Sequence, residues 1–167
     1  LLMQRYLVEH DLPSDALSGF AVQAHANGVN NPNAYFRKAI THEMYAQSDL
    51  TNAPLNLFDS APYADGAAAV ILTRRDLLPK DFAHPIVRMI GSSVSIDTLA
   101  LHDRKEPLAF KATKQAVEHA CAQAGIMPIY TDVLELDDSY SIYAALTLEA
   151  CGYAEPGDAP RMACEGL

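Results

Sequence analysis

The chain has 167 residues and half of its side chains are hydrophobic, so it is long and apolar enough to form an ordinary globular domain with a core. Its formal net charge of −9 argues against nucleic acid or an anionic membrane surface as a partner, because both are polyanions. The three cysteines cannot all pair within one chain, and no asparagine begins an N-x-S/T motif, so we expect a cytoplasmic protein.

The ends of the sequence carry no targeting signal that we can identify. The first residues, "LLMQRYLVEHDL", carry charge too early for a signal peptide, and no apolar run reaches the length of a membrane span. We therefore expect no membrane-spanning segment. Because the chain begins without methionine, we interpret it as a piece of a longer polypeptide.

The first part of the chain is predicted to be helical. Residues 1–10 form one helix, and a second follows "LPS", with Ser14 as its N-cap and Gly28 as its C-terminal stop. Thr41 is predicted to cap a short helix through "HEMYAQS". This stretch begins like a zinc-protease signature, but Ala46 stands where a second histidine is required, so we expect no metal site.

Strands and helices are predicted to alternate in the rest of the chain. Val70–Leu72 indicate a strand buried on both faces, and further strands are predicted in "PIVRMIGSSVS" from Pro85 and in "VLEL", residues 133–136. The stretch "LAFKATKQAVEHACAQA" predicts a helix with Pro107 in its first turn and Gly125 at its end. This alternation indicates parallel pairing, and hence an α/β layered sheet.

The stretch "VLELDDSYSIYAALTLEACGY", residues 133–153, is the predicted place for chemistry. Asp137 and Asp138 follow the predicted strand, and ligands in open α/β sheets bind beyond the carboxyl ends of strands. The alternative is that Asp138 or Ser139 only caps the following helix. Asp137 is harder to explain as a cap, because one capping carboxylate is enough and a second adds repulsion.

The cysteines do not indicate a nucleophile. Cys121 falls on the apolar stripe of its predicted helix and Cys151 lies just before Gly152, so both are predicted to be small buried hydrophobes. The environment of Cys164 is not predicted. None of the three has a helix N-terminus or a basic residue nearby in the sequence to lower its pKa.

Three stretches resemble the thiolase superfamily, in particular acetyl-CoA acetyltransferases and lipid-transfer-type thiolases. They read "HANGVNNPNAYFRKAIT", "PLNLFDSAPYADGAAAVIL" and "DVLELDDSYSIYAALTLEACGYAEPG". The third is similar to the segment in which the family carries "E-L-H-D-A-F-S". On that pattern Asp138 matches the family's aspartate, Tyr140 stands where phenylalanine is usual, and Asp137 occupies the position of the histidine.

The departure at Asp137 bears on the chemistry that the resemblance implies. In the family that histidine helps to form the oxyanion hole for the thioester carbonyl. An ionised carboxylate cannot donate a hydrogen bond and repels developing negative charge, so Asp137 could substitute only if burial kept it protonated. The resemblance therefore assigns Asp137 and Asp138 to catalytic positions and Tyr140 to the substrate pocket, with the key donor replaced.

The resemblance also implies an architecture and a reaction. The fold would be a thiolase-like αβαβα layered α/β fold, with residues 1–78 at the end of its N-terminal half and residues 79–167 at the start of its C-terminal half. The parent protein would transfer acyl groups on acyl-CoA thioesters, as acetyl-CoA C-acetyltransferases do, with a nucleophilic cysteine upstream of this chain. Acyl-CoA and CoA are then the expected ligands, no separate cofactor is expected, and the parent is expected to be a homo-oligomer.

Two alternatives stay open at this point. The first is a catalytically degenerate thiolase fold that binds acyl-CoA or a partner subunit, and the residue at position 137 is the reason to consider it. The second is an unrelated cytoplasmic α/β binding domain whose helix is capped at residue 138.

Overall fold

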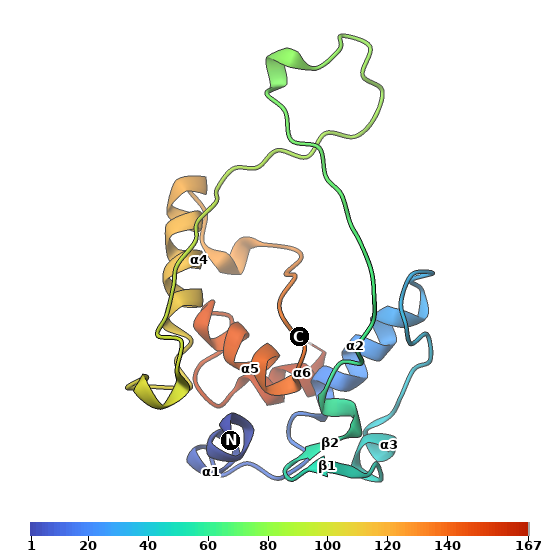
Figure 1. The fold of residues 1–167 in the computed structure, drawn as a ribbon, viewed down its shortest axis with the longest axis vertical. Coiled ribbons are helices and arrows are strands. Elements are labelled where there is room, and N and C mark those ends of the chain that lie inside the picture. Colours follow the sequence, from blue (N-terminus) through green and yellow to red (C-terminus); the bar gives the residue numbers. More distant parts are fainter. Residues whose placement is uncertain (167) are drawn as a thin grey trace.

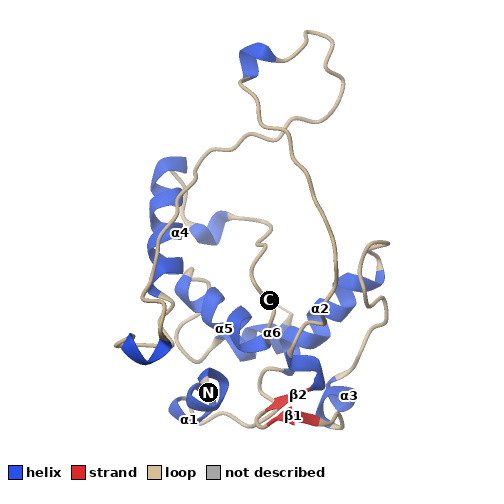
Figure 2. Cartoon of the chain, viewed as in Figure 1, coloured by secondary structure: helices blue, strands red, loops and turns tan. Residues whose placement is uncertain are grey.

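The computed structural model describes residues 1–166, which form a helical body and a long extended excursion (Figures 1 and 2). The α-helices are α1 (Leu2–Glu9), α2 (Ser18–Val29), α3 (His42–Ala46), α4 (Lys111–Ala124), α5 (Ser141–Ala150) and α6 (Ala159–Glu165). Short 3₁₀ helices cover Leu57–Asp59, Arg75–Leu77, Leu101–Asp103 and Pro128–Tyr130. Strands β1 (Leu50–Asn52) and β2 (Leu55–Asn56) form an antiparallel hairpin. Among these residues, no helix is long and apolar enough to cross a membrane.

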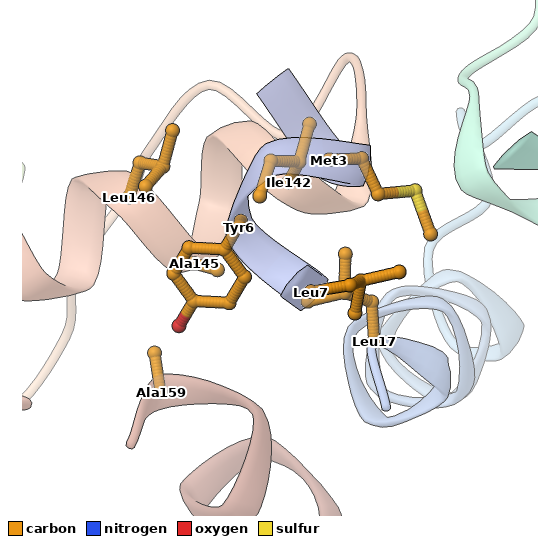
Figure 3. Packing of buried hydrophobic residues seen from close by; sticks show 8 residues of the cluster. All are labelled: Met3, Tyr6, Leu7, Leu17, Ile142, Ala145, Leu146 and Ala159. Carbon is orange, nitrogen blue, oxygen red and sulfur yellow. The ribbon is translucent and has the colours of Figure 1, made fainter. Parts of the chain in front are cut away.

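The main core joins α1 to α5, two helices from opposite ends of the sequence (Figure 3). Its buried residues are Met3, Tyr6, Leu7, Leu17, Ile142, Ala145, Leu146 and Ala159. The core residues of α1 and those of α5 have the same i, i+3, i+4 spacing, which puts each set on one helix face. Fully burying a large apolar side chain stabilises a fold by about 1.5–3 kcal/mol, so this contact fixes α5 against the body.

A second contact brings α2 against α6. A Cβ atom at Gly19 would lie 2.6 Å from the backbone carbon of Ala163, closer than any side chain allows. Glycine at position 19 is therefore needed for the two helices to approach this closely. The contact holds the C-terminal helix beside the first part of the chain.

The predicted helix over residues 1–10 and the short helix capped by Thr41 are confirmed. Thr41 Oγ1 accepts a hydrogen bond from the Met44 amide at 3.2 Å, at the start of α3. The predicted ends of α2 are wrong. Ser14 is not its N-cap, because residues 13–18 form tight turns that bury Leu17 in the core, and α2 begins only at Ser18.

Glycines and prolines mark the helix ends less reliably than predicted. Gly28 lies inside α2, where a Cβ atom would come within 2.7 Å of the Phe36 carbonyl oxygen, so it serves a close approach and not a stop. Pro107 lies outside α4, which begins after Phe110, a residue with a positive φ of 41°. Gly125 does end α4, in the left-handed conformation at φ 71°, as predicted.

The three predicted strands, at Val70–Leu72, from Pro85 and at 133–136, are extended but pair with no strand within residues 1–166, so the predicted parallel sheet is wrong for this structure. A strand needs a neighbour for its backbone amides and carbonyls, and none of the described segments supplies one. The apolar side chains are accordingly exposed: Ile71 is 95% and Val87 94% accessible. The apolar pattern had predicted burial.

One of these extended segments lies along α4. A Cβ atom at Gly91 would lie 2.2 Å from the Ala120 carbonyl oxygen, and the Ser92 amide donates a hydrogen bond of 3.0 Å to Gln123 Oε1. Figure 1 shows the same segment returning beside α4 from the far end of the excursion. The glycine of "GSS" thus allows the backbone to reach the helix.

Candidate functional site

The predicted site residues lie together in the loop that leads into α5. Asp137 Oδ1 accepts two hydrogen bonds from Ser139, one from its backbone amide at 2.9 Å and one from its hydroxyl. Both hydrogen bonds lower the pKa of Asp137, and the one from the Ser139 hydroxyl has the larger effect. Because the carboxyl group is also exposed, it is ionised at neutral pH and can only accept hydrogen bonds. The burial that could have kept Asp137 protonated is not observed.

The predicted caps of α5 are wrong. Its N-cap is Tyr140, which makes no side-chain capping hydrogen bond, and neither Asp138 nor Ser139 takes that role. Ser139 is instead engaged with Asp137, and Asp138 is exposed. The Tyr140 carbonyl accepts the first helical hydrogen bond, from the Tyr143 amide at 2.8 Å. The start of α5 thus depends on backbone hydrogen bonds and on Ser141, the residue that follows Tyr140.

Tyr140 is partly exposed beside the two aspartates. Its ring meets the ring of Tyr143 edge-on, with centroids 5.3 Å apart and an interplanar angle of 76°. Its side chain is 37% accessible, so part of the ring and its surroundings face solvent. The structure therefore places Asp137, Asp138 and Tyr140 on one exposed loop.

A buried carboxylate that the sequence analysis did not single out lies directly behind this loop. Asp59 is 1% accessible and accepts hydrogen bonds from the Tyr45 hydroxyl at 2.7 Å and from the Asn56 amide at 2.8 Å. The Ser141 hydroxyl, at the first position of α5, donates to the same carboxylate. Three donors from three segments thus compensate the burial of one charge.

The local part of this arrangement has a sequence signal. Asn56 and Asp59 form a capping box around the 3₁₀ helix Leu57–Asp59. The Asn56 side chain accepts a hydrogen bond from the Phe58 amide, and the Asp59 side chain accepts one from the Asn56 amide. An Asn followed three residues later by an acidic residue in "NLFD" could have indicated this box. The donors Tyr45 and Ser141 could not have been found in this way, because they are distant in the sequence.

Backbone pairing joins the same two parts of the chain. Ser60 and Tyr140 form an isolated antiparallel bridge, and the Ala61 amide donates to the Ser139 carbonyl at 3.0 Å. The segment after Asp59 and the loop before α5 therefore lie side by side. They belong to the second and third stretches that carry the thiolase resemblance.

The cysteines do not contribute a nucleophile to this loop. Cys151 is 5% accessible, and burial, with a smaller contribution from Cys121, raises the pKa of its thiol. It follows the C-terminal end of α5, about 15 Å along the helix from the loop at 1.5 Å per residue. The predicted burial is confirmed for Cys151, whereas Cys121 is partly accessible and Cys164 exposed.

No other part of residues 1–166 brings the predicted site residues to a metal cluster or a cavity. Among residues 1–166, no cluster of three or more His, Cys, Asp or Glu side chains could hold a metal ion. An open cavity of about 390 Å³ lies between α1, α4 and α5, and its charged lining includes Arg5, Glu9, Lys111, Lys114 and Glu149. None of the predicted site residues lines it. The loop before α5 is therefore the better candidate.

Comparisons with known proteins bear on this loop and on the fold. Residues 93–167 match the family described as "Thiolase C-terminal domain-like". The chain is 32% identical to an acetyl-CoA acetyltransferase of Methanothermobacter thermautotrophicus over all of its residues, which are 43% of that relative. It is 33% identical to the acetyl-CoA acetyltransferase of Methanocaldococcus jannaschii, covering 97% of this chain and 42% of the relative. Sterol carrier protein 2 of Gallus gallus is 30% identical over 81% of the chain, which corresponds to 25% of that protein.

A solved structure has the same fold. The "Ltp2-ChsH2(DUF35) aldolase" superposes with a TM-score of 0.85 at 22% identity, covering 99% of this chain and 44% of the solved one. The chain thus spans less than half the length of these relatives. Together the matches place the chain in the thiolase superfamily and confirm the thiolase-like α/β fold class that the sequence predicted.

Proposed function

We propose that the protein to which this chain belongs is a thiolase-like acyltransferase acting on acyl-CoA thioesters, of the acetyl-CoA C-acetyltransferase type. The observation that carries the proposal is the similarity, over the whole chain, to two curated acetyl-CoA acetyltransferases at 32% and 33% identity. In this proposal the loop Asp137–Tyr140 lines the thioester pocket. Acyl-CoA and CoA are the ligands, and the assembly is a homo-oligomer.

The geometry of the loop supports a binding surface with a negative charge at its centre. Asp137 is an exposed, ionised carboxylate, and Ser139 is held against it. A negatively charged carboxylate at position 137 repels the negative charge that develops on the thioester oxygen in the transition state. In this proposal the hydrogen-bond donors that stabilise this oxygen therefore come from other groups. In this proposal the acyl-carrying cysteine likewise lies outside this chain. Cys151 is unsuited to that role, because it is buried and its thiol pKa is raised.

Two assays test the proposed activity. The complete polypeptide that carries this chain is expected to cleave acetoacetyl-CoA in a CoA-dependent reaction, and the 167 residues alone are expected to have no such activity. Absence of thiolysis by the complete polypeptide with a series of 3-ketoacyl-CoA substrates would contradict the proposal. Turnover by the isolated chain would contradict the assignment of the nucleophile to another part of the protein.

A second candidate function is a degenerate thiolase fold that binds acyl-CoA or a partner subunit without catalysis. The carboxylate at position 137 favours it, since the resemblance places a hydrogen-bond donor there. The exposed apolar side chains of Ile71 and Val87 offer a surface for another chain. This candidate predicts CoA binding by calorimetry without turnover.

The substitution Asp137→His in the complete polypeptide separates the two candidates. If the fold is degenerate because position 137 has lost an oxyanion donor, histidine is expected to raise the rate of thiolysis by about 10²–10³-fold, the effect of one such donor, with unchanged CoA affinity. In the acyltransferase of the first proposal, whose donors come from other groups, it is expected to leave kcat without such a gain. The matched control is Asp132→His, which exchanges another exposed aspartate on the way to the same loop. An equal effect of both substitutions, or no effect of either, would speak against a donor role for position 137.

A further inference from the structure

We propose that Asp59 is a positioning residue: its buried carboxylate holds the first residue of α5, Ser141, and thereby sets the position of the site loop Asp137–Tyr140. The inference rests on the proposed function for its catalytic consequence. Its structural part rests on the hydrogen bonds of Asp59 and on the backbone pairing next to it. Asp59 itself lies behind the loop and is 1% accessible, so it has no direct role in contacting substrate.

The first step of the argument is the burial of a charged group. Moving a carboxylate out of water costs several kcal/mol unless donors replace its hydration. Asp59 has such donors: the Tyr45 hydroxyl from α3, the Asn56 amide from β2 and the Ser141 hydroxyl from α5. A carboxylate fixed by three different segments leaves each of them little freedom to move independently.

The second step is the part that Ser141 plays in α5. A serine at a helix start usually uses its hydroxyl to cap the helix or faces solvent. Ser141 is 5% accessible, and its hydroxyl instead points back to Asp59. The α5 N-terminus is thus anchored to the segment Asn56–Asp59 and not only to its own turn.

The third step links this anchor to the site loop. Tyr140 directly precedes Ser141 and is bridged to Ser60, which directly follows Asp59. One residue further out on each side, the Ala61 amide donates to the Ser139 carbonyl at 3.0 Å. The buried hydrogen bond of Ser141 and this backbone pairing are adjacent along both segments, so a shift of Ser141 is transmitted to the loop.

The other end of α5 offers a matched control. There the Tyr6 hydroxyl donates to Glu149 Oε1, which makes it a second contact between a buried tyrosine and a carboxylate. Tyr6→Phe removes a hydroxyl donor from a carboxylate just as Tyr45→Phe does, but it does so far from the site loop. A loss of stability common to both variants can therefore be separated from an effect on the loop.

The experiment uses the complete polypeptide with four substitutions: Ser141→Ala, Ser141→Thr, Tyr45→Phe and Tyr6→Phe. Amide hydrogen exchange of residues 137–140 is measured by mass spectrometry, and kcat and KM for CoA-dependent thiolysis are measured in parallel. Ser141→Ala and Tyr45→Phe are expected to speed exchange in the loop. Their kcat is expected to fall about 10- to 100-fold, the scale of a misplaced catalytic group, with a smaller change in KM.

The controls are expected to behave differently. Ser141→Thr keeps the hydroxyl and should restore both the exchange rate and kcat, while Tyr6→Phe should leave the loop exchange and kcat at wild-type values. Unchanged exchange at residues 137–140 in Ser141→Ala overturns the inference, as does an equal effect of Tyr6→Phe. If the wild-type polypeptide has no thiolysis activity, the proposed function fails, and the hydrogen-exchange comparison still decides on Asp59.

Discussion

The hydroxyl of Tyr6 in α1 donates a hydrogen bond to Glu149 near the C-terminal end of α5, although the two residues are 143 positions apart. The Gly157 amide donates to the same carboxylate oxygen at 2.9 Å. Burial raises the pKa of Glu149, with these hydrogen bonds working in the opposite direction. The carboxyl group therefore prefers its neutral form in the folded protein more than it does in the unfolded chain.

The raised pKa predicts a pH dependence of stability. Stability contributed by Glu149 is fully present below its ordinary pKa of 4.5 and is lost as the pH rises through the higher folded-state value. Glu149→Gln, which cannot ionise, should therefore match the wild type in acid and exceed it near neutral pH. Thermal melts of the complete polypeptide across this range measure the difference. A constant offset between wild type and Glu149→Gln would contradict the argument.

The close approach at Gly91 predicts a localised packing defect. Because a Cβ atom would lie 2.2 Å from the Ala120 carbonyl oxygen, Gly91→Ala forces the extended segment away from α4. Overpacking of this kind typically destabilises a protein by about 1–3 kcal/mol. Denaturant unfolding of the complete polypeptide measures the loss. Ser92→Ala is the control, since it keeps the amide that bonds Gln123, and a similar loss in both variants would refute the steric explanation.

The exposed apolar segments predict association of the isolated chain. Ile71 and Val87 are almost fully accessible and lie in extended backbone without a strand neighbour among the described residues. Such edges template pairing with other chains, so the 167-residue chain should associate with increasing concentration. Light scattering after gel filtration measures the mass, and the double variant Ile71→Lys/Val87→Lys should shift it towards the monomer. Val8→Lys, an exposed apolar position on α1, should have little effect.

The contact between Asp137 and Ser139 predicts a change in acidity. Ser139→Ala removes the hydroxyl donor that is the main cause of the lowered pKa, so the pKa of Asp137 should rise towards its ordinary value. Carbon-detected NMR titration of labelled aspartate side chains measures this directly. Ser139→Thr retains a hydroxyl and should titrate like the wild type. An unchanged Asp137 titration in Ser139→Ala would mean that the hydroxyl contact does not persist in solution.

The sequence was sufficient for features that depend on neighbouring residues. The helix over residues 1–10, the Thr41 cap and the Gly125 stop depend on local geometry, and the structure confirms all three. The family could also be recognised, because its motifs are continuous stretches. The division at residues 78 and 79, the cytoplasmic location and the roles of Asp137, Asp138 and Tyr140 stay predictions.

Features that depend on distant partners could not be predicted. Ser14 was a reasonable cap, but the burial of Leu17 in the core shifts the start of α2. Asp138 and Ser139 were reasonable caps of α5, but its N-cap is Tyr140, and the next residue, Ser141, bonds to the distant Asp59. The predicted strands were wrong because a strand also depends on distant residues. Their apolar character indicates burial, yet the backbone partners that a strand requires are not among the described residues.

The bridge between Ser60 and Tyr140 closes the intervening chain into one long loop whose two ends lie side by side in the body. Leu108 and Phe110 also pack this loop against the main core, whereas the segment that contains Arg75–Leu77 extends far from the body in Figure 1. Lengthening a closed loop adds little entropy cost, so the outer part of this loop can vary in length while its two ends stay in place. Evolutionary or engineered insertions near Arg75–Leu77 can therefore remodel the outer part of the loop without disturbing the residues that pair at its ends.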